Sequence, residues 1–143
     1  MKLVQHLLDS KGREIISVTA DASVLDAIIL MAERRIGSLL VMSGDQLQGI
    51  VTERDYARKV IVKGRSSKTT SVAEIMTEDI FTTTPQETVN RCMNVMTKRK
   101  IRHLPVLDGD TVIGMISIGD LVQAIIADQQ EEIDHLAHYI HGQ

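Results

Sequence analysis

The chain carries one pattern of a glycine, a hydroxyl residue and an aspartate at two places. It reads GIVTERD over residues 49–55 and, 65 positions later, GMISIGD over residues 114–120. A hydroxyl residue followed three positions later by a carboxylate is typical of the first turn of a helix. Backbone amides at a helix start attract an anion, and a carboxylate there can accept the hydroxyls of a ribose. The pattern therefore predicts either two helix caps or two nucleotide-binding elements.

Capping alone explains the hydroxyl residue and the carboxylate of each copy. Thr52 and Ser117 would each accept a backbone hydrogen bond, while Asp55 and Asp120 would reach back to the start of the helix. Capping makes no demand for a glycine three positions before the hydroxyl residue, whereas a glycine lets the backbone come close to a flat ring. The glycines therefore favour a bound ligand, and the capping interpretation stays open beside it.

Charge distinguishes the second copy from the first. The segment KRKIRHLP (residues 98–105) contains five basic residues next to a predicted strand, whereas the first copy has Gly37 and Ser38 in place of Arg102 and His103. A phosphate-binding role would give a reason to place cations at one copy only. A solvated basic face is the alternative explanation of the same pattern.

The elements that position these residues are repeated as well. An offset of 65 positions aligns about residues 18–122 without gaps, with identities such as Met31/Met96 and Gly44/Gly109. An internal repeat of this kind predicts two units that cannot bury their cores alone and that pack on each other. The apolar periods predict in each copy a strand, a helix, a hairpin of two strands and a final helix. The predicted ranges are 15–18, 24–32, 38–42, 47–51 and a helix from 52, then 80–83, 87–98, 103–107, 111–116 and a helix from 117 towards 139.

Segments around the repeats yield further expectations. Residues 63–71, KGRSSKTTS, predict a surface connection, followed by a short helical turn at VAEIM (residues 72–76). The helix over 24–32 is apolar nearly all round, which indicates a second packing partner and hence a homodimer. Ile126, Ile133 and Ile140 keep a heptad spacing, so the last helix is a candidate for pairing with a partner's helix.

Composition excludes several classes of function. With a net charge of −3, no Trp, one Phe and two Tyr in 143 residues, the chain is not expected to bind nucleic acid. No run approaches the ~20 apolar residues of a membrane span. The single Cys92 excludes an internal disulfide and, with no secretory signal in view, predicts a cytoplasmic protein. His135, His138 and His141 drift around a helix, so no metal site is expected.

The paired Gly-h-h-Ser/Thr-x-x-Asp elements, where h is apolar, stand after IGSLLV (residues 36–41) and IRHLPV (residues 101–106). Together these motifs resemble cystathionine β-synthase (CBS) domains in a tandem pair of the stand-alone bacterial type. The resemblance covers roughly residues 10–127. It implies an α+β fold of two βαββα motifs packed as a pseudo-twofold pair, a Bateman module, with N- and C-terminal helical extensions. The implied parts are motif 1 at about 10–63, a linker at about 64–71, motif 2 at about 72–127 and a C-terminal helical extension at 128–143.

The resemblance also implies a function. Such pairs bind AMP, ADP, ATP, sometimes NAD or S-adenosylmethionine, in clefts between their motifs, and form dimers through the motif helices. This chain would then be an adenine-nucleotide sensor that signals to a partner protein of unknown identity. The implied nucleotide-binding residues are Asp55 and Asp120 for the ribose, Thr52, Ser117, Arg54, Arg102 and His103 near the phosphates or ribose, and Ser17, Val18, Thr19, Thr82, Thr83 and Thr84 around the base.

The alternatives to a sensor are an interaction module and an enzyme. A ligand-free dimerisation or protein-interaction module would use the aspartates as helix caps only. An enzyme finds no support, because no nucleophile with its base, no metal set and no phosphate loop can be recognised, and no catalytic cofactor is expected. The first copy also departs from the family pattern, with Ala20 and Leu40 where the second copy has Pro85 and Pro105.

Overall fold

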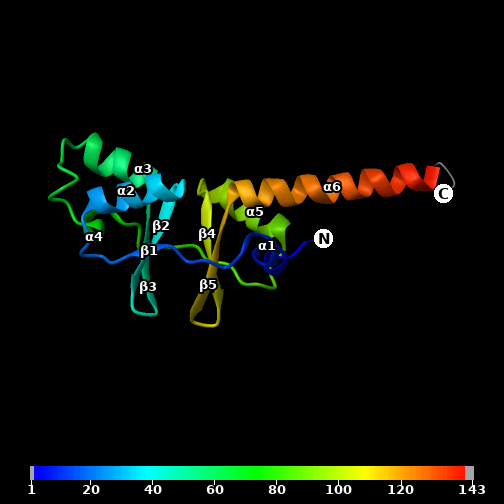
Figure 1. The fold of residues 1–143 in the computed structure, drawn as a ribbon, viewed down its shortest axis with the longest axis horizontal. Coiled ribbons are helices and arrows are strands. Elements are labelled where there is room, and N and C mark those ends of the chain that lie inside the picture. The colour runs from blue at the N-terminus through cyan, green and yellow to red at the C-terminus, as the bar shows by residue number, and fades with distance from the viewer. Residues whose placement is uncertain (1, 141–143) are drawn as a thin grey trace. The chain divides into compact units, whose positions relative to one another are not determined.

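The computed structural model describes residues 2–140. The chain divides into two units. The first-copy unit is Ile15–Phe81, and the second-copy unit combines Met1–Glu14 with Thr82–Gln143. Both units mix helices with small sheets, so the predicted α+β class is confirmed (Figure 1).

The first-copy unit contains one three-stranded sheet. Strand β1 pairs in parallel with β2, and β2 pairs antiparallel with β3. This arrangement is the predicted strand, helix, hairpin and helix order, followed by the short helix expected after the linker. The elements are β1 (Ser17–Val18), α2 (Val24–Arg34), β2 (Ser38–Ser43), β3 (Gln46–Thr52), α3 (Glu53–Tyr56), a turn of π-helix η1 (Ala57–Ile61) and α4 (Val72–Ile75).

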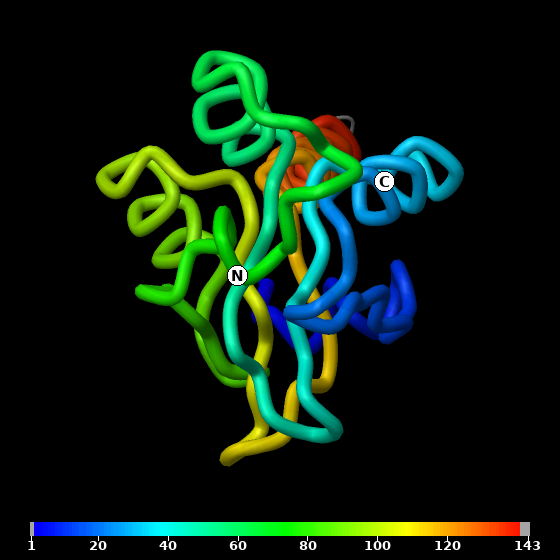
Figure 2. Tube along the Cα trace, turned by 90° about the vertical axis from the view of Figure 1, so that its left-hand side faces the viewer, coloured from blue at the N-terminus to red at the C-terminus, as the bar shows by residue number. Residues whose placement is uncertain are grey.

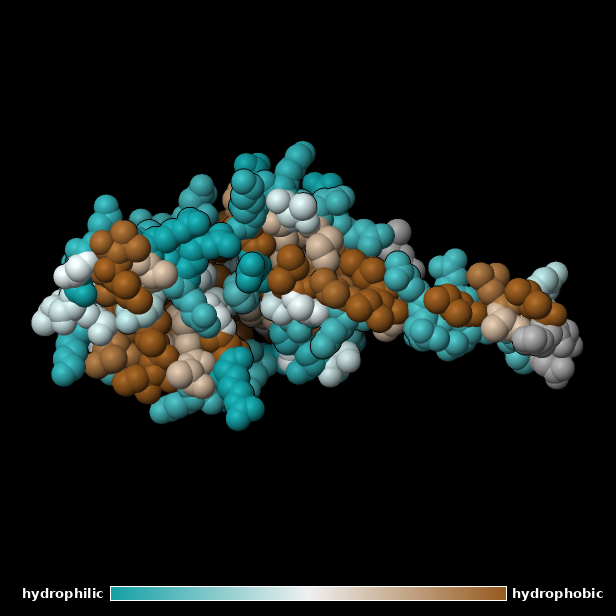
Figure 3. All heavy atoms as spheres, turned by 90° about the horizontal axis from the view of Figure 1, so that it is seen from above, coloured by the Kyte–Doolittle hydropathy of each residue, from teal (hydrophilic) through white to brown (hydrophobic). Residues whose placement is uncertain are grey.

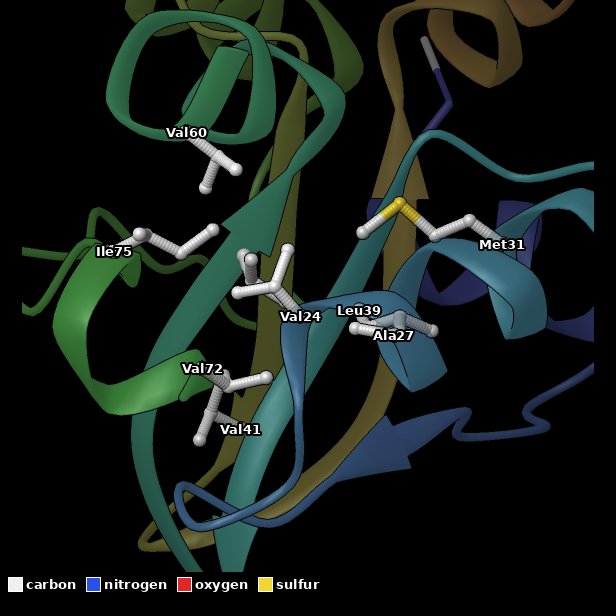
Figure 4. Packing of buried hydrophobic residues seen from close by; sticks show 9 residues of the cluster. Val24, Ala27, Met31, Leu39, Val41, Val60, Val72 and Ile75 are labelled. Carbon is white, nitrogen blue, oxygen red and sulfur yellow. The ribbon is translucent and has the colours of Figure 1, made fainter. Parts of the chain in front are cut away.

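The core of this unit lies where α2 and α4 pack on the sheet. Val24, Ala27 and Met31 recur on one face of α2, and Val72 and Ile75 come from α4; all are at most 3% exposed (Figure 4). Ile29, on another face of α2, is 45% exposed. The apolar residues around α2 are therefore not all covered within the chain, and the homodimer stays a prediction.

The second-copy unit contains a two-stranded antiparallel sheet, β4 and β5. Gly109 forms the turn of this hairpin with φ +63°, and Gly44 forms the turn of the first hairpin with φ +58° (Figure 2). The predicted left-handed glycines are therefore confirmed. The elements of the unit are α1 (Val4–Lys11), α5 (Val89–Arg99), β4 (His103–Asp108), β5 (Thr111–Ser117) and α6 (Ile118–Ile140).

The strand predicted over residues 80–83 is wrong, since only a single parallel bridge joins Thr83 to Val106. In the first copy the N–H of Leu40 donates to the carbonyl of Ile16 at 3.3 Å, which extends the ladder of β1. The corresponding residue of the second copy is Pro105, which has no N–H to donate. The proline therefore shortens the pairing to one bridge.

Helix α1 takes the same place in the second-copy unit that α4 takes in the first. The N–H of Val4 donates to the carbonyl of Glu87 at 2.9 Å, just as the N–H of Val72 donates to that of Ala22 at 2.8 Å. Val4 and Leu8 are fully buried. The expected N-terminal extension is therefore part of the packing of the second copy, although it precedes the first copy in the chain.

We expect Leu8→Ala to destabilise the second-copy unit by about 2–5 kcal/mol, because it removes a fully buried side chain and leaves a cavity. The exposed Ser10→Ala, on the same helix, is the control and should change stability by less than ~0.5 kcal/mol. Hydrogen exchange locates the effect. Faster exchange in residues 15–81 than in residues 82–140 of the Leu8→Ala protein would contradict the assignment of α1 to the second copy.

Candidate nucleotide-binding aspartates

Both repeated elements begin a helix with a reciprocal cap. The N–H of Asp55 donates to Oγ1 of Thr52 at 3.1 Å, and the N–H of Thr52 donates to the Asp55 carboxylate at 3.0 Å. In the second copy the N–H of Asp120 donates to Oγ of Ser117 at 3.2 Å, and the N–H of Ser117 donates to Asp120 at 2.8 Å. The capping geometry predicted from the sequence is therefore present twice.

The first backbone amide of each helix is also used within the chain. Glu53 donates its N–H to the carbonyl of Gly37 at 3.1 Å, and Ile118 donates to the carbonyl of Arg102 at 2.8 Å. With the caps included, two of the first three amides of each helix have a partner in the protein. Each helix start therefore has few free amides with which to bind an anion, and any contact with a phosphate has to rely on side chains.

In the first copy, both oxygens of Asp55 are engaged. Oδ2 accepts from the N–H and the hydroxyl of Thr52. Oδ1 lies 3.1 Å from Nζ of Lys59 and accepts from the hydroxyl of Thr77 at 3.3 Å. The ammonium of Lys59 is held in turn by the carbonyl of Ile75 at 2.8 Å. With only 10% of its side chain exposed, Asp55 is closed off by its neighbours.

In the second copy, Asp120 pairs with a lysine from α1. Nζ of Lys11 lies 2.6 Å from Oδ2 of Asp120 and also donates to the carbonyl of Met115 at 2.8 Å. Burial by itself would raise the pKa of Asp120, but the hydrogen bonds from Lys11 and from the Ser117 N–H outweigh it and hold the pKa below its ordinary value. The carboxylate is therefore ionised at neutral pH, with 22% of its side chain exposed.

A pocket of about 260 Å³ opens beside this ion pair, within the second-copy unit. Helices α1 and α6 form its walls, so both Lys11 and Asp120 face it, together with Lys2 and His6. The rest of the lining is largely small or apolar. Asp120 is thus an ionised carboxylate at the edge of a hollow that also contains basic side chains.

His103 begins β4 directly opposite Ser117 in the hairpin register. Burial, together with the positive charges of Lys11 and Arg102, lowers its pKa to about 4 against the opposing pull of Asp120. The imidazole is therefore neutral at pH 7, where it can donate or accept a hydrogen bond but adds no charge. Arg102, by contrast, is exposed.

The other predicted residues divide between core and surface. Thr83 is buried, and its hydroxyl lies 3.3 Å from the sulfur of Cys92, while Val18 packs against the core of the first-copy unit. The side chain of Thr83 is therefore almost completely buried, and that of Val18 is partly buried. Exposed members of the set are Ser17, Thr19, Arg54, Thr82 and Thr84, of which Thr19 donates to Asp21 at 2.6 Å.

The repeated glycines are required by the packing of the chain. A Cβ on Gly49 would lie 2.9 Å from the carbonyl oxygen of Thr77 and 3.0 Å from the sulfur of Met76. On Gly114 it would lie 2.7 Å from a methyl group of Leu8. The packing accounts for these glycines without a ligand, so the sequence-based argument from the glycines no longer favours a ligand over helix caps.

Lys11 was missed by the sequence analysis. It lies 109 positions from Asp120, in a helix whose partner the local pattern does not reveal. Lys59 is four positions after Asp55 and could be predicted as its partner from helical spacing.

Neither a metal site nor a membrane-spanning helix is present in the part of the chain that the structure describes. Among residues 2–140, no group of three or more His, Cys, Asp or Glu side chains is arranged to hold a metal ion. His141, one of the three histidines considered, lies outside this range. No helix in the same range has the length and apolar content that a membrane crossing requires.

Comparison with known proteins identifies the family. The CBS domain family matches residues 11–62 and 72–127. The solved structure of a protein with CBS domains from Burkholderia ambifaria MC40-6 is 54% identical, with a TM-score of 0.87, over 90% of this chain and 96% of that one. The mitochondrial CBS domain-containing protein CBSX3 of Arabidopsis thaliana is 44% identical over 97% of this chain and 72% of its own length. The chain belongs to the CBS-domain family and carries two CBS domains in tandem.

A more distant structure shares the fold. The CBS domain pair of protein MJ0100 has a TM-score of 0.79 at 24% identity, over 90% of this chain and 98% of that one. That pair was solved in complex with 5′-methylthioadenosine and S-adenosyl-L-methionine. The tandem CBS fold predicted from the sequence is confirmed.

We expect Gly49→Ala to destabilise the ligand-free protein by about 1–3 kcal/mol, since the added methyl group meets backbone as well as side-chain atoms. Gly119→Ala is the matched control. A Cβ added there would lie 3.6 Å from Oγ of Ser117, an ordinary van der Waals contact, and in a helix alanine is favoured over glycine by up to about 1 kcal/mol. Chemical denaturation measures both. An unchanged stability of Gly49→Ala would show that the glycine is not needed for packing.

We also expect the neutral His103 to give stability a pH dependence. Between its folded pKa of about 4 and its ordinary value of 6.5, the unfolded chain binds a proton that the folded chain does not. Stability from this group is therefore complete above pH 6.5 and falls by about 1.5 kcal/mol on going down to pH 5. Urea unfolding at a series of pH values should show this decrease, and His103→Gln should remove it. His138→Gln, on the exposed part of α6, should retain it; equal slopes in the wild type and in His103→Gln would refute the assignment.

Proposed function

We propose that this CBS pair is a regulatory module that binds an adenine nucleotide or a related adenosine derivative and signals the bound state to a partner protein. The ligand class includes AMP, ADP, ATP and NAD, with S-adenosylmethionine as a further member. Membership of the CBS family supports a module of this kind, as does the likeness in fold to a pair that holds two adenosine derivatives. The proposed location is the cytoplasm, and no catalytic step is proposed.

The observation that carries the proposal is a difference between the two aspartates in which carboxylate oxygens are already bonded within the protein. Asp55 has both carboxylate oxygens engaged by Thr52, Lys59 and Thr77. At Asp120, by contrast, the bonds from Lys11 and Ser117 both end on Oδ2. We propose that Oδ1 of Asp120 is the oxygen that accepts a ribose hydroxyl and that the second copy is the one that binds the ligand.

The charges around Asp120 suit a phosphorylated nucleoside. The carboxylate has a lowered pKa and so remains an acceptor for hydroxyl groups at neutral pH. Lys11 contacts it directly, and the exposed Arg102 precedes His103, the strand residue opposite Ser117, so two cations lie near the start of α6. Cations so placed can bind phosphate oxygens by charge-assisted hydrogen bonds. The neutral His103 adds a hydrogen-bonding group.

Exposed apolar residues in the first-copy unit support the proposed homodimer through the motif helices. Ile29 in α2 is 45% exposed, and Ile61 and Val62 at the end of η1 are 59% and 76% exposed. Large apolar side chains that gather on helices are a common basis for association. The dimer would bring together two copies of the module.

A ligand-free interaction module is the second candidate function. It is favoured by the complete caps at both helix starts and by the internal packing of Gly49 and Gly114. Under this alternative the aspartates stabilise helices, and the exposed apolar surfaces carry the function.

Thermal unfolding with and without each nucleotide tests the proposal. A ligand at ~100 times its dissociation constant adds ~2.7 kcal/mol, which raises the midpoint by several degrees. We expect this rise in the wild type and its loss in Asp120→Asn. Asp55→Asn should keep the rise. Asp110→Asn, in the exposed turn between β4 and β5, controls for the change in charge and should also keep it.

The outcomes separate the two functions. A rise that survives in Asp120→Asn and disappears in Asp55→Asn would move the ligand to the first copy. No rise with any of the five ligands, in a wild-type protein that unfolds cooperatively, would overturn the sensor and leave the interaction module.

A further inference from the structure

The C-terminal half of α6 has no covering element in its own unit. Leu121 and Ala124, near the start of the helix, are buried against the rest of the second-copy unit. All residues from 129 to 140 are exposed, and α6 continues past the elements beside it (Figure 1). About three turns of helix that are solvated on every side have little tertiary packing to stabilise them.

Apolar residues form one stripe along this exposed helix. Val122, Ile126, Ile133, Leu136 and Ile140 are 43–75% exposed. They follow one another at spacings of four, seven, three and four, which is the a and d pattern of a heptad repeat. Figure 3 shows apolar side chains along the extended part of the molecule that carries this helix. We call Val122, Ile126, Gln129, Ile133, Leu136 and Ile140 the α6 seam.

We propose that the α6 seam pairs with the same seam of a second copy of this chain, as a parallel, in-register, two-stranded coiled coil. Ile126, Ile133 and Ile140 occupy the a positions, and Leu136 occupies a d position. Isoleucine at a with leucine at d favours two parallel strands over three or four. The seam begins in the last helix of motif 2 and continues beyond it, whereas the apolar residues that support the proposed homodimer lie in the first-copy unit.

Gln129, the polar member of the seam, selects the partner and its direction. It occupies a d position, and in a parallel in-register pair each d residue faces its own copy. Its amide would then meet the Gln129 amide of the second copy, and the two can hydrogen-bond. In an antiparallel pair, d residues face a residues, so Gln129 would always face isoleucine. An apolar groove on an unrelated partner would likewise bury the amide without a hydrogen bond, which is costly.

Charges beside the seam are compatible with two identical helices. Glu132 is the one charged residue at the e and g positions between 123 and 139, and in the parallel pair it faces Ala137 of the second copy. The acidic residues Asp128, Glu131 and Asp134 lie at b, c and f positions, away from the seam. Parallel pairing therefore brings no like charges together at the interface.

Disulfide cross-linking of the full chain tests partner and direction together. A cysteine at a position that faces the same position of the second copy can meet the narrow range of distances that a disulfide requires. We expect Gln129→Cys to form a covalent dimer about tenfold faster or more than Glu131→Cys, its control on the opposite face of α6. Cys92 is present in both variants and is buried. Equal rates would overturn the proposal. Cross-linking only in a mixture of Gln129→Cys with Ile133→Cys would show antiparallel pairing and overturn the register.

Sedimentation equilibrium provides a second readout that does not depend on cysteine. We expect the double variant Ile126→Glu/Ile133→Glu to self-associate with a dissociation constant at least tenfold larger than that of the wild type, because it keeps only the proposed pairing through the motif helices. The control His135→Glu/His138→Glu adds the same two charges at c and f positions and should retain the wild-type dissociation constant. Circular dichroism confirms that both variants are folded. An unchanged dissociation constant for the Ile126→Glu/Ile133→Glu protein would overturn the proposal.

Discussion

Each unit depends on a close contact between a glycine and a segment from outside the repeated strand, helix and hairpin. Leu8 of α1 packs on Gly114, and the stretch after α4, Met76 and Thr77, packs on Gly49. A side chain at either glycine would push this segment away, since even one extra methyl group is felt in a close-packed interior. Each glycine lies three residues before the N-cap residue of the following helix, so the contact also fixes the positions of the cap and of the aspartate. The fold therefore explains the repeated motif before any ligand is considered.

The segment that packs on each glycine, here called the closing segment, also makes the surroundings of the two aspartates different. In the first copy the closing segment brings the hydroxyl of Thr77 to Asp55 and the carbonyl of Ile75 to Lys59, and the carboxylate is enclosed. In the second copy the closing segment is α1, whose last residue, Lys11, pairs with Asp120 beside an open pocket. Two elements with the same spacing of glycine, hydroxyl residue and aspartate thus acquire different exposure and different partners. The asymmetry arises from the closing segments rather than from the repeat itself.

Local patterns were enough to predict most of the fold. Apolar periods located the helices and hairpins, and the glycines at 44 and 109 marked the turns with positive φ. Prediction failed where a distant residue decides the outcome. Pro105 reduces the pairing of Thr83 to one bridge, Leu8 explains Gly114, and Lys11 reaches Asp120 from 109 positions away. The caps could be predicted because all their atoms lie within four consecutive residues, whereas the partners of the carboxylates could not, because they depend on tertiary packing.

Helix α6 joins the two surfaces for which roles are proposed in the second copy. Asp120 stands in its first turn, and the α6 seam runs along its exposed length to Ile140. After Gly119 the helix contains no further glycine and no proline, the usual sources of a kink. A change in the direction of its first turn would therefore be carried to its far end. A ligand at Asp120 can alter self-association only if it binds one arrangement of α6 more tightly than another. By linkage, pairing of the seam would then change the affinity for the ligand by the same factor.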